Sequence, residues 1–308
     1  MTGEFADEEH TMNDGTGDQA PLGVTVGVDG SDNAARAALW AAREALLRAV
    51  PLTMVSALNL PENAVSLSGE PSEFAQRRRA EGAALLKLTA EALQTEFPQL
   101  VVDTQLSDLS PVRALAGLGA RSELLVTGTR GLGGFTGLLL GSVTRKLAAH
   151  ATCPLVTVRG EQPATVLDEV VLGIGERPEQ AGPAIAYAFN AAQRCGAALH
   201  AVRAWLPFAA HSGQMGSYSS DFTEIRDEEQ RSVERLLEPM RASFPDVSVV
   251  VSVGRGNPVP ILIEAARDTR LVVVGAPRHH GPLSVGAGYV VEGMLSHSPT
   301  PVAVVPEP

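Results

Sequence analysis

The sequence predicts an α/β protein made of two tandem, doubly wound domains, each with a five-stranded parallel sheet. The first observation is length: the chain has 308 residues, which at ~150 residues per domain is enough for two. The second is an internal repeat. The third is the alternation of short apolar runs with helical patterns, since strands joined through helices form parallel sheets covered on both faces. Right-handed crossovers then restrict each sheet to a doubly wound topology.

The two halves of the sequence repeat each other at an offset of 147 residues, which pairs Leu124–Gly128 with Leu271–Gly275. Further pairs at this offset are Gly134 and Gly281, Gly141 and Gly288, Val143 and Val290, His150 and His297, and Pro154 and Pro301. We therefore divide the chain into a tail over residues 1–21, a first domain over 22–160, a linker over 161–168 and a second domain over 169–308. The tail is expected to be disordered, as chain termini often are.

Each half is expected to run through strands and helices in alternation. Ser31 or Asp32 can cap the first helix, which keeps helical spacing of its apolar residues as far as Ala49. Expected elements of the first half are strands at Val24–Asp29, Leu52–Leu58, Val101–Leu106, Leu124–Gly128 and Leu155–Val158, and helices after Ser31 and at Ser72–Glu96, Pro111–Arg121 and Ser142–His150. Expected strands of the second half are Val170–Gly175, Ala198–Ala204, Val247–Val253, Leu271–Gly275 and Val302–Val305, with helices between them.

The charge of the chain argues against nucleic-acid and membrane partners. The formal net charge is −11, and the first twenty residues contain six acids and no Lys or Arg. An acidic surface binds phosphate backbones and anionic lipids poorly.

Cys153 and Cys195 are too few for a disulfide framework or a cysteine-rich metal site. The acidic start is unlike a signal peptide, and no run approaches ~20 apolar residues, so we expect a cytoplasmic protein.

The segment after the fourth strand is the most informative for function. In a doubly wound sheet, ligands bind beyond the carboxyl ends of the strands, where the strand order reverses. Residues 128–143 join the fourth strand to a helix through a glycine-rich loop, which ends in Gly141 and Ser142. Glycine lets the backbone approach a ligand, and the amides at a helix start favour an anion. Arg130, Arg145 and Lys146 add cations, although a loop of this composition is also typical of a flexible surface loop.

Gly128, Gly131, Gly141 and Ser142 form the pattern G-x2-G-x9-G-S. This pattern, between a strand and a helix, resembles the ATP-binding signature of the universal stress protein family. The opening strand and turn at residues 26–31 and the closing segment at residues 153–156 are also similar to that family. The resemblance covers residues 22–160 and, more weakly, 168–306, as in the tandem members of the family. It implies a Rossmann-like domain of the adenine nucleotide alpha hydrolase type.

The resemblance also implies roles at matching positions. Asp29 would accept a hydrogen bond from the adenosine part, and Ala57 would contact adenine through its backbone. The residues implied for the phosphates and the loop around them, together with the nearby cation, are Gly128, Arg130, Gly131, Gly141, Ser142 and Val143. Asp29 could instead serve only as a turn or cap residue and Ser142 only as a helix cap. ATP is the expected ligand, with Mg²⁺ as an optional companion.

The second half departs from this pattern. Gly175 replaces Asp29, Arg278 replaces Gly131 and Tyr289 replaces Ser142. Further replacements are Pro277 for Arg130, Glu292 for Arg145 and Gly293 for Lys146. A carboxylate near a helix start repels phosphate, so we expect the second half to bind ATP poorly or not at all.

Three functions remain open. The leading hypothesis is a regulatory ATP-binding module in the stress response, without dedicated catalysis. The second is a scaffold with no working nucleotide site, in which the last strands, Leu155–Val158 and Val302–Val305, pair the halves within one chain, with homodimerisation as an extension. The third is an enzyme, either a slow ATPase or a nucleotide transferase of a related α/β superfamily, although no P-loop is present. His279, His280 and His297 are better interpreted as surface histidines than as metal ligands.

Overall fold

The computed structural model describes residues 22–61, 71–131, 140–150, 152–160, 167–205, 222–277 and 287–308. Several sequence predictions concern residues outside these ranges: the acidic tail at 1–21, the middle of the glycine loop at 132–139, most of the linker, and Arg278, His279, His280 and Gly281.

One ten-stranded sheet runs through both halves, in the order β3-β2-β1-β4-β5-β10-β9-β6-β7-β8. Strands of the first half are β1 (Leu22–Gly27), β2 (Leu52–Ala57), β3 (Val102–Ser107), β4 (Ser122–Gly128) and β5 (Leu155–Val158). Strands of the second half are β6 (Leu167–Ile174), β7 (Ala198–Trp205), β8 (Val249–Arg255), β9 (Thr269–Pro277) and β10 (Val302–Glu307). Five parallel strands in each half, in the same relative order, confirm the predicted fold class.

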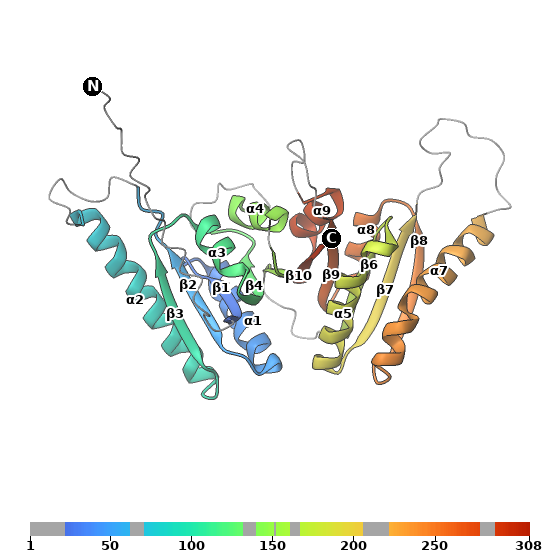
Figure 1. The fold of residues 1–308 in the computed structure, drawn as a ribbon, viewed down its shortest axis with the longest axis horizontal. Coiled ribbons are helices and arrows are strands. Elements are labelled where there is room, and N and C mark those ends of the chain that lie inside the picture. The colour runs from blue at the N-terminus through green and yellow to red at the C-terminus, as the bar shows by residue number, and fades with distance from the viewer. Residues whose placement is uncertain are drawn as a thin grey trace, which may run out of the picture.

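Helices cover both faces of this sheet (Figure 1). The first half contributes α1 (Asp32–Arg48), α2 (Glu73–Glu96), α3 (Pro111–Gly119) and α4 (Ser142–His150). The second half contributes α5 (Gly182–Cys195), α7 (Phe222–Ser243), α8 (Pro258–Ala265) and α9 (Tyr289–His297), with a short 3-10 turn at Pro178–Gln180. One core cluster lies under α1, α2, α5 and α7, and the other lies under α3, α4, α8 and α9.

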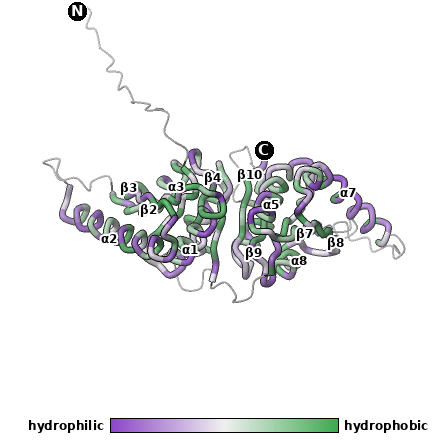
Figure 2. Tube along the Cα trace, turned by 90° about the horizontal axis from the view of Figure 1, so that it is seen from below, coloured by the Kyte–Doolittle hydropathy of each residue, from purple (hydrophilic) through white to green (hydrophobic). Residues whose placement is uncertain are grey.

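The strands alternate between these two cores. In β4, for example, Leu124 and Val126 belong to the first cluster and Leu125 to the second, and all three are almost completely buried. Burying each such side chain contributes about 1.5–3 kcal/mol. Figure 2 shows the hydrophobic strands inside and the hydrophilic surface of α7 outside. Burial on both faces explains why these strands appear in the sequence as apolar runs without polar alternation.

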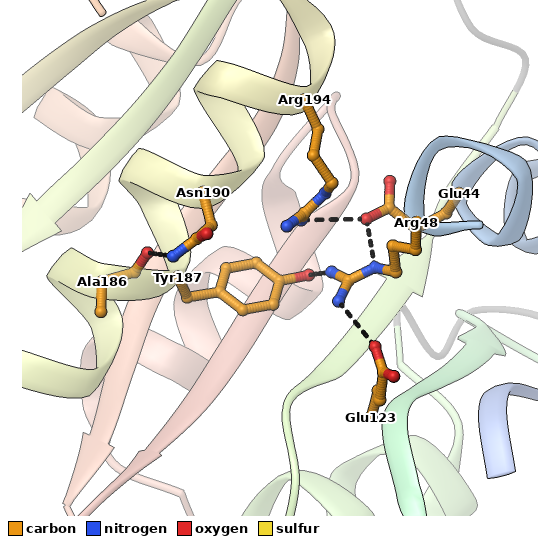
Figure 3. Close-up of polar contacts among 7 residues, drawn as sticks. All are labelled: Glu44, Arg48, Glu123, Ala186, Tyr187, Asn190 and Arg194. Atoms are coloured by element: carbon orange, nitrogen blue, oxygen red, sulfur yellow. Dashed lines mark hydrogen bonds and ion pairs between the residues drawn. The ribbon is translucent and has the colours of Figure 1, made fainter. Parts of the chain in front are cut away.

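The two halves meet where β5 pairs with β10 in antiparallel orientation, with Val156 opposite Ala303. This confirms the expectation that the last strands pair the halves within one chain. The interface continues between α1 and α5 (Figure 3): Nη2 of Arg194 lies 3.2 Å from Oε1 of Glu44, and Nε of Arg48 lies 2.7 Å from the same oxygen. Arg48 also donates to the hydroxyl of Tyr187 at 3.3 Å.

Some boundaries differ from the sequence predictions. Strand β6 begins at Leu167, inside the predicted linker, because Leu167 pairs with Thr269 and Asp168 forms an ion pair with Arg270. Strand β1 ends at Gly27 rather than at Asp29, which leaves Asp29 in a turn. The apolar pattern alone did not contain this information, because pairing with a distant strand determines where a strand begins and ends.

Candidate functional site

The candidate site of the first half lies at the carboxyl ends of β1 and β4. These neighbouring strands mark the switch point of the half, because the chain continues from β1 to β2 and β3 on one side and later places β4 and β5 on the other. Ligands of doubly wound sheets bind at this point. Asp29 follows β1, and Arg130 and Gly131 follow β4, so the sheet brings residues about a hundred positions apart to the same edge.

Asp29 is held in a tight turn before α1. Its Oδ1 accepts hydrogen bonds from the amide of Ser31 at 3.0 Å and from the hydroxyl of Ser31 at 2.7 Å. Ser31 in turn caps α1 by accepting from the amide of Ala34 at 3.2 Å, and Gly30 has the positive φ of 86° that the turn needs. The turn role that the sequence left open is therefore present. It also orients the carboxylate toward the β4 side of the site.

Gly128 at the end of β4 and Gly131 after it leave space that other groups fill. A Cβ on Gly131 would collide with Oδ2 of Asp29, so Gly131 lets the carboxylate lie against the loop backbone. A Cβ on Gly128 would lie 2.8 Å from the backbone of Asn33 in α1. Gly128 therefore requires glycine because its neighbour is backbone, and Gly131 leaves the space in which the Asp29 carboxylate lies. The role of Asn33 was not predicted, since asparagine near a helix start is common.

The loop closes on itself before α4 begins. The amide of Gly141 donates to the carbonyl of Thr129 at 2.7 Å, and the hydroxyl of Thr144 donates to the carbonyl of Gly128 at 2.9 Å. These two bonds fix the start of α4 beside the end of β4. The amides of Ser142 and Val143 lie in the first turn, where a helix has no internal carbonyl to accept them, and the helix dipole favours an anion there. Ser142 is exposed and Val143 is half-buried.

Two arginines add positive charge at this edge. Arg130 is exposed after β4, and Arg159 follows β5. The pKa of Arg159 lies below its usual value, first because the side chain is partly buried and second because the charge of Arg130 is close. The sequence prediction named Arg130 and missed Arg159. Its place directly after the fifth strand was the signal that could have identified it.

Ala57 ends β2 on the same edge. The register pairs Gly27 of β1 with Val55 of β2, so Asp29 and Ala57 both lie just beyond the paired segment. The structure thus gathers the predicted residues of the first half into one region: the β1 turn, the end of β2, the loop stem after β4 and the start of α4. Their roles toward a ligand stay predictions.

The second half has a different set of groups at the equivalent edge. Tyr289 begins α9, is 65% exposed, and its hydroxyl accepts from Nδ2 of Asn257 at 2.7 Å. Glu292 lies half-buried in the first turn of the same helix. Gly175 supplies no carboxylate at the position equivalent to Asp29, although the exposed Glu176 follows it. An anion would therefore meet a bulky phenol and a negative charge where α4 of the first half presents Ser142 and cations.

Other kinds of site find no support in the part of the chain that the structure describes. No group of three or more His, Cys, Asp or Glu side chains there could hold a metal ion. Among the described helices, none combines the length and apolar character needed to cross a membrane.

Comparison with known proteins places this geometry in a family. The model of the universal stress protein family matches residues 23–159 and again 167–306. The chain belongs to the universal stress protein family. A universal stress protein of Mycobacterium tuberculosis is 30% identical over 290 residues, covering 92% of this chain and 96% of its own. One of Mycolicibacterium smegmatis is 31% identical over 293 residues, covering 92% and 96%.

A solved universal stress protein from Archaeoglobus fulgidus has the same fold. It superposes with a TM-score of 0.69 at 15% identity, covering 92% of this chain and 96% of its own. The match extends over both halves, as does the family model, so this universal stress protein is a tandem member of the family.

Proposed function

We propose that this universal stress protein binds ATP in its first half and acts as a regulatory nucleotide-binding module in the stress response. The observation that carries the proposal is the contact between Asp29 and Gly131 across the switch point. It places a fixed carboxylate and a glycine backbone within one small region, next to the start of α4. A nucleotide needs both kinds of group: an acceptor for its sugar hydroxyls and amides for its phosphates.

Each part of the nucleotide then has a partner. Oδ2 of Asp29 is oriented toward the loop and would accept from a ribose hydroxyl, while Oδ1 stays bonded to Ser31. The amides of Ser142 and Val143 would receive the phosphates, assisted by the dipole of α4. Arg130 and Arg159 would balance the negative charge. Ala57 would contact adenine through its backbone.

We propose one nucleotide per chain. Tyr289 and Glu292 occupy the start of α9, and Gly175 supplies no acceptor for a sugar. These residues replace the groups proposed to bind the phosphates and the sugar in the first half. The second half is therefore expected to bind ATP poorly or not at all.

Binding without efficient turnover fits this site best. Phosphoryl transfer to water needs a group that orients the water. Asp29 is committed to the sugar end, and the charged side chains described around the start of α4 are cations, namely Arg130, Arg145, Lys146 and Arg159. Mg²⁺ would then enter bound to the phosphates of ATP rather than to a protein carboxylate. We expect at most slow hydrolysis, measurable as phosphate release.

ATP would act by shifting a conformational equilibrium. The loop stem and α4 lie on the same face of the sheet as α3, near the joint with the second half. A ligand that binds one arrangement of this stem better than another changes the population of each.

A cytoplasmic location belongs to the same proposal, since Cys153 and Cys195 are both free thiols, as is usual in a reducing compartment.

Titration calorimetry with ATP tests the proposal on the full chain. Wild type is expected to bind one ATP, and Asp29→Ala to bind at least ~10-fold more weakly, since a hydrogen bond to a charged group is lost. Asp103→Ala, which changes an exposed carboxylate on β3, is the control and should match wild type. Equal ATP affinities of Asp29→Ala and wild type would show that Asp29 is not part of the nucleotide site.

A scaffold without a nucleotide is the second candidate, favoured by the antiparallel pairing of β5 with β10. That pairing makes a single sheet whose outer strands are β3 and β8. Mass spectrometry of ligand released from freshly purified protein separates the two candidates. Recovery of an adenine nucleotide would decide against the scaffold, and an empty protein that also fails to bind ATP would favour it.

A further inference from the structure

The second half contains a cavity of about 490 Å³ at its own switch point, beyond the ends of β6 and β9. This volume is within the usual range for small-molecule sites. Its apolar wall includes Val202, Leu262, Val274, Ala287 and Val291. Its polar lining includes Glu176, Arg177, Arg203, Asn257, Tyr289 and Glu307.

A shortened helix borders this cavity, which Gln180 and Ala181 line. Helices α1 and α5 end at equivalent residues, Arg48 and Cys195, which are 147 positions apart. However, α1 has 17 residues and α5 has 14, because α5 begins only at Gly182, after the turn at Pro178–Gln180. The second half therefore lacks the first helical turn that packs over the end of β4 in the first half.

Glu307 occupies part of the space that this missing turn leaves. In the first half, Gly128 packs against Asn33 of α1. The equivalent glycine, Gly275, packs instead against the carboxyl group of Glu307, which comes from the end of β10. A different polar group thus lies over the same glycine in the two halves. Position 307 corresponds to Gly160 in the first half, so this carboxyl group has no counterpart there.

Glu307 is a buried residue that lines the cavity. The residue is 8% exposed, and no hydrogen bond or ion pair to it occurs among the described residues. Burial raises its pKa from 4.5 to about 7. A buried carboxylate without a donor costs free energy, and such groups are normally paired. A bound molecule with a donor would supply the missing partner.

The neighbouring cations are already engaged elsewhere or lie at the rim. Nε of Arg203 lies 3.0 Å from Oε2 of Glu229, and its Nη1 donates to the carbonyls of Ile174 and Gly175. Arg177 is exposed beside Glu176 in the turn after β6. Glu307 is therefore the acceptor that defines the polar end of the cavity.

We propose that this cavity binds a small organic amine with a flat apolar body, whose N–H groups donate to Glu307. The apolar wall of the cavity, which includes Val202 and Val291, would contact the apolar body of the amine. A metal ion is a poor alternative, since no described group of three or more metal-ligating side chains exists. A phosphate is a poor alternative because Glu307 would repel it. This site is independent of the ATP site proposed for the first half.

Three indole probes of similar shape test the proposal on the full chain at pH 8. They are tryptamine, a cation; tryptophol, neutral; and indole-3-propionate, an anion. Calorimetry and ligand-observed NMR should show tryptamine binding at least ~10-fold more tightly than tryptophol, with indole-3-propionate weakest, because a charge-assisted hydrogen bond is stronger than a neutral one.

Two variants and one control make the result specific. Glu307→Gln keeps the shape and should remove the preference for tryptamine over tryptophol. Gly175→Leu adds a large side chain at a residue that lines the cavity and has no heavy atom within 4 Å of its Cβ position, and it should abolish binding of all three probes. Glu238→Gln, an exposed position on α7, should behave as wild type. The proposal is overturned if no probe binds, if the anion binds best, or if Glu307→Gln retains the wild-type preference.

Discussion

Arg194 and Glu44 connect the two halves through one carboxylate oxygen. Nη2 of Arg194 in α5 lies 3.2 Å from Oε1 of Glu44 in α1, and Nε of Arg48 lies 2.7 Å from the same atom. The side chains of Glu44 and Arg48 are only 10% and 9% exposed (Figure 3). One buried carboxylate therefore balances the positive charges of two arginines from different halves. The interface between the halves thus depends on more than the pairing of β5 with β10.

Glu44→Gln is expected to destabilise the protein by about 2–4 kcal/mol, because it leaves two arginines without their shared counter-charge. Chemical denaturation followed by circular dichroism measures the change. Glu96→Gln is the matched control, since Glu96 pairs with Arg43 on the surface, where the side chains are 51% and 53% exposed. This change should cost less than about 0.5 kcal/mol. Equal effects of the two variants would contradict the role of Glu44.

Gly128→Ala is expected to destabilise the first half by about 1–3 kcal/mol, because the new Cβ would meet the backbone of Asn33 at 2.8 Å and neither chain can yield cheaply. Gly117→Ala in α3 is the control: no heavy atom lies within 4 Å of its Cβ position. There alanine favours the helix and should stabilise it by up to ~1 kcal/mol. Thermal unfolding of the two variants should therefore shift in opposite directions.

Gly131→Ala is expected to weaken ATP binding at least ~10-fold while changing stability less than Gly128→Ala does. Its Cβ would displace the carboxylate of Asp29, which is exposed and can move. The comparison is made by calorimetry with ATP and by thermal unfolding without ligand. Unchanged ATP affinity in this variant would show that the contact between Asp29 and Gly131 does not form part of the nucleotide site.

The stability of the protein should fall as pH rises from about 5 to 7, through the carboxyl group of Glu307. Burial raises its pKa to about 7 from 4.5. The unfolded chain then loses its proton at a lower pH than the folded chain, so the contribution of this group to folding is largest below pH 4.5 and is lost by pH 7. Glu307→Gln removes the dependence.

The measurement is the free energy of unfolding at pH 5 and pH 8, in the same ionic strength. At pH 8, Glu307→Gln should be more stable than wild type by about 2 kcal/mol, and at pH 5 the two should be nearly equal. Glu238→Gln serves as the control at both values, since that side chain is exposed. A loss of stability in Glu307→Gln at pH 8 would instead show that Glu307 is ionised and paired in the native protein.

Cys153 is expected to resist alkylation in the native protein. Burial raises the pKa of its thiol to about 11, so at pH 8 only about one molecule in a thousand carries the reactive thiolate. Mass spectrometry after iodoacetamide treatment should show at least ~100-fold slower modification of Cys153 in buffer than in 8 M urea. Modification at the same rate in both solutions would mean that Cys153 is accessible in the folded state.

The sequence by itself determined the fold class and the location of the candidate site in the first half. Apolar runs such as Leu124–Gly128 indicate buried strands, because strands covered on both faces have no polar alternation. The repeat at 147 residues predicted two similar halves. The glycines at 128 and 131 indicated close backbone approach, and both do pack against other groups. These signals are local, so one segment of sequence contains each of them.

Only the tertiary structure decided which distant groups meet. It joined the halves through β5 and β10 and placed Arg194 beside Glu44. It put Arg159 near Arg130, and it placed Glu307 against Gly275. Each of these relationships depends on where separate elements end in space, and the physical reason is that side-chain contact follows the packing of the sheet and its helices rather than spacing along the chain.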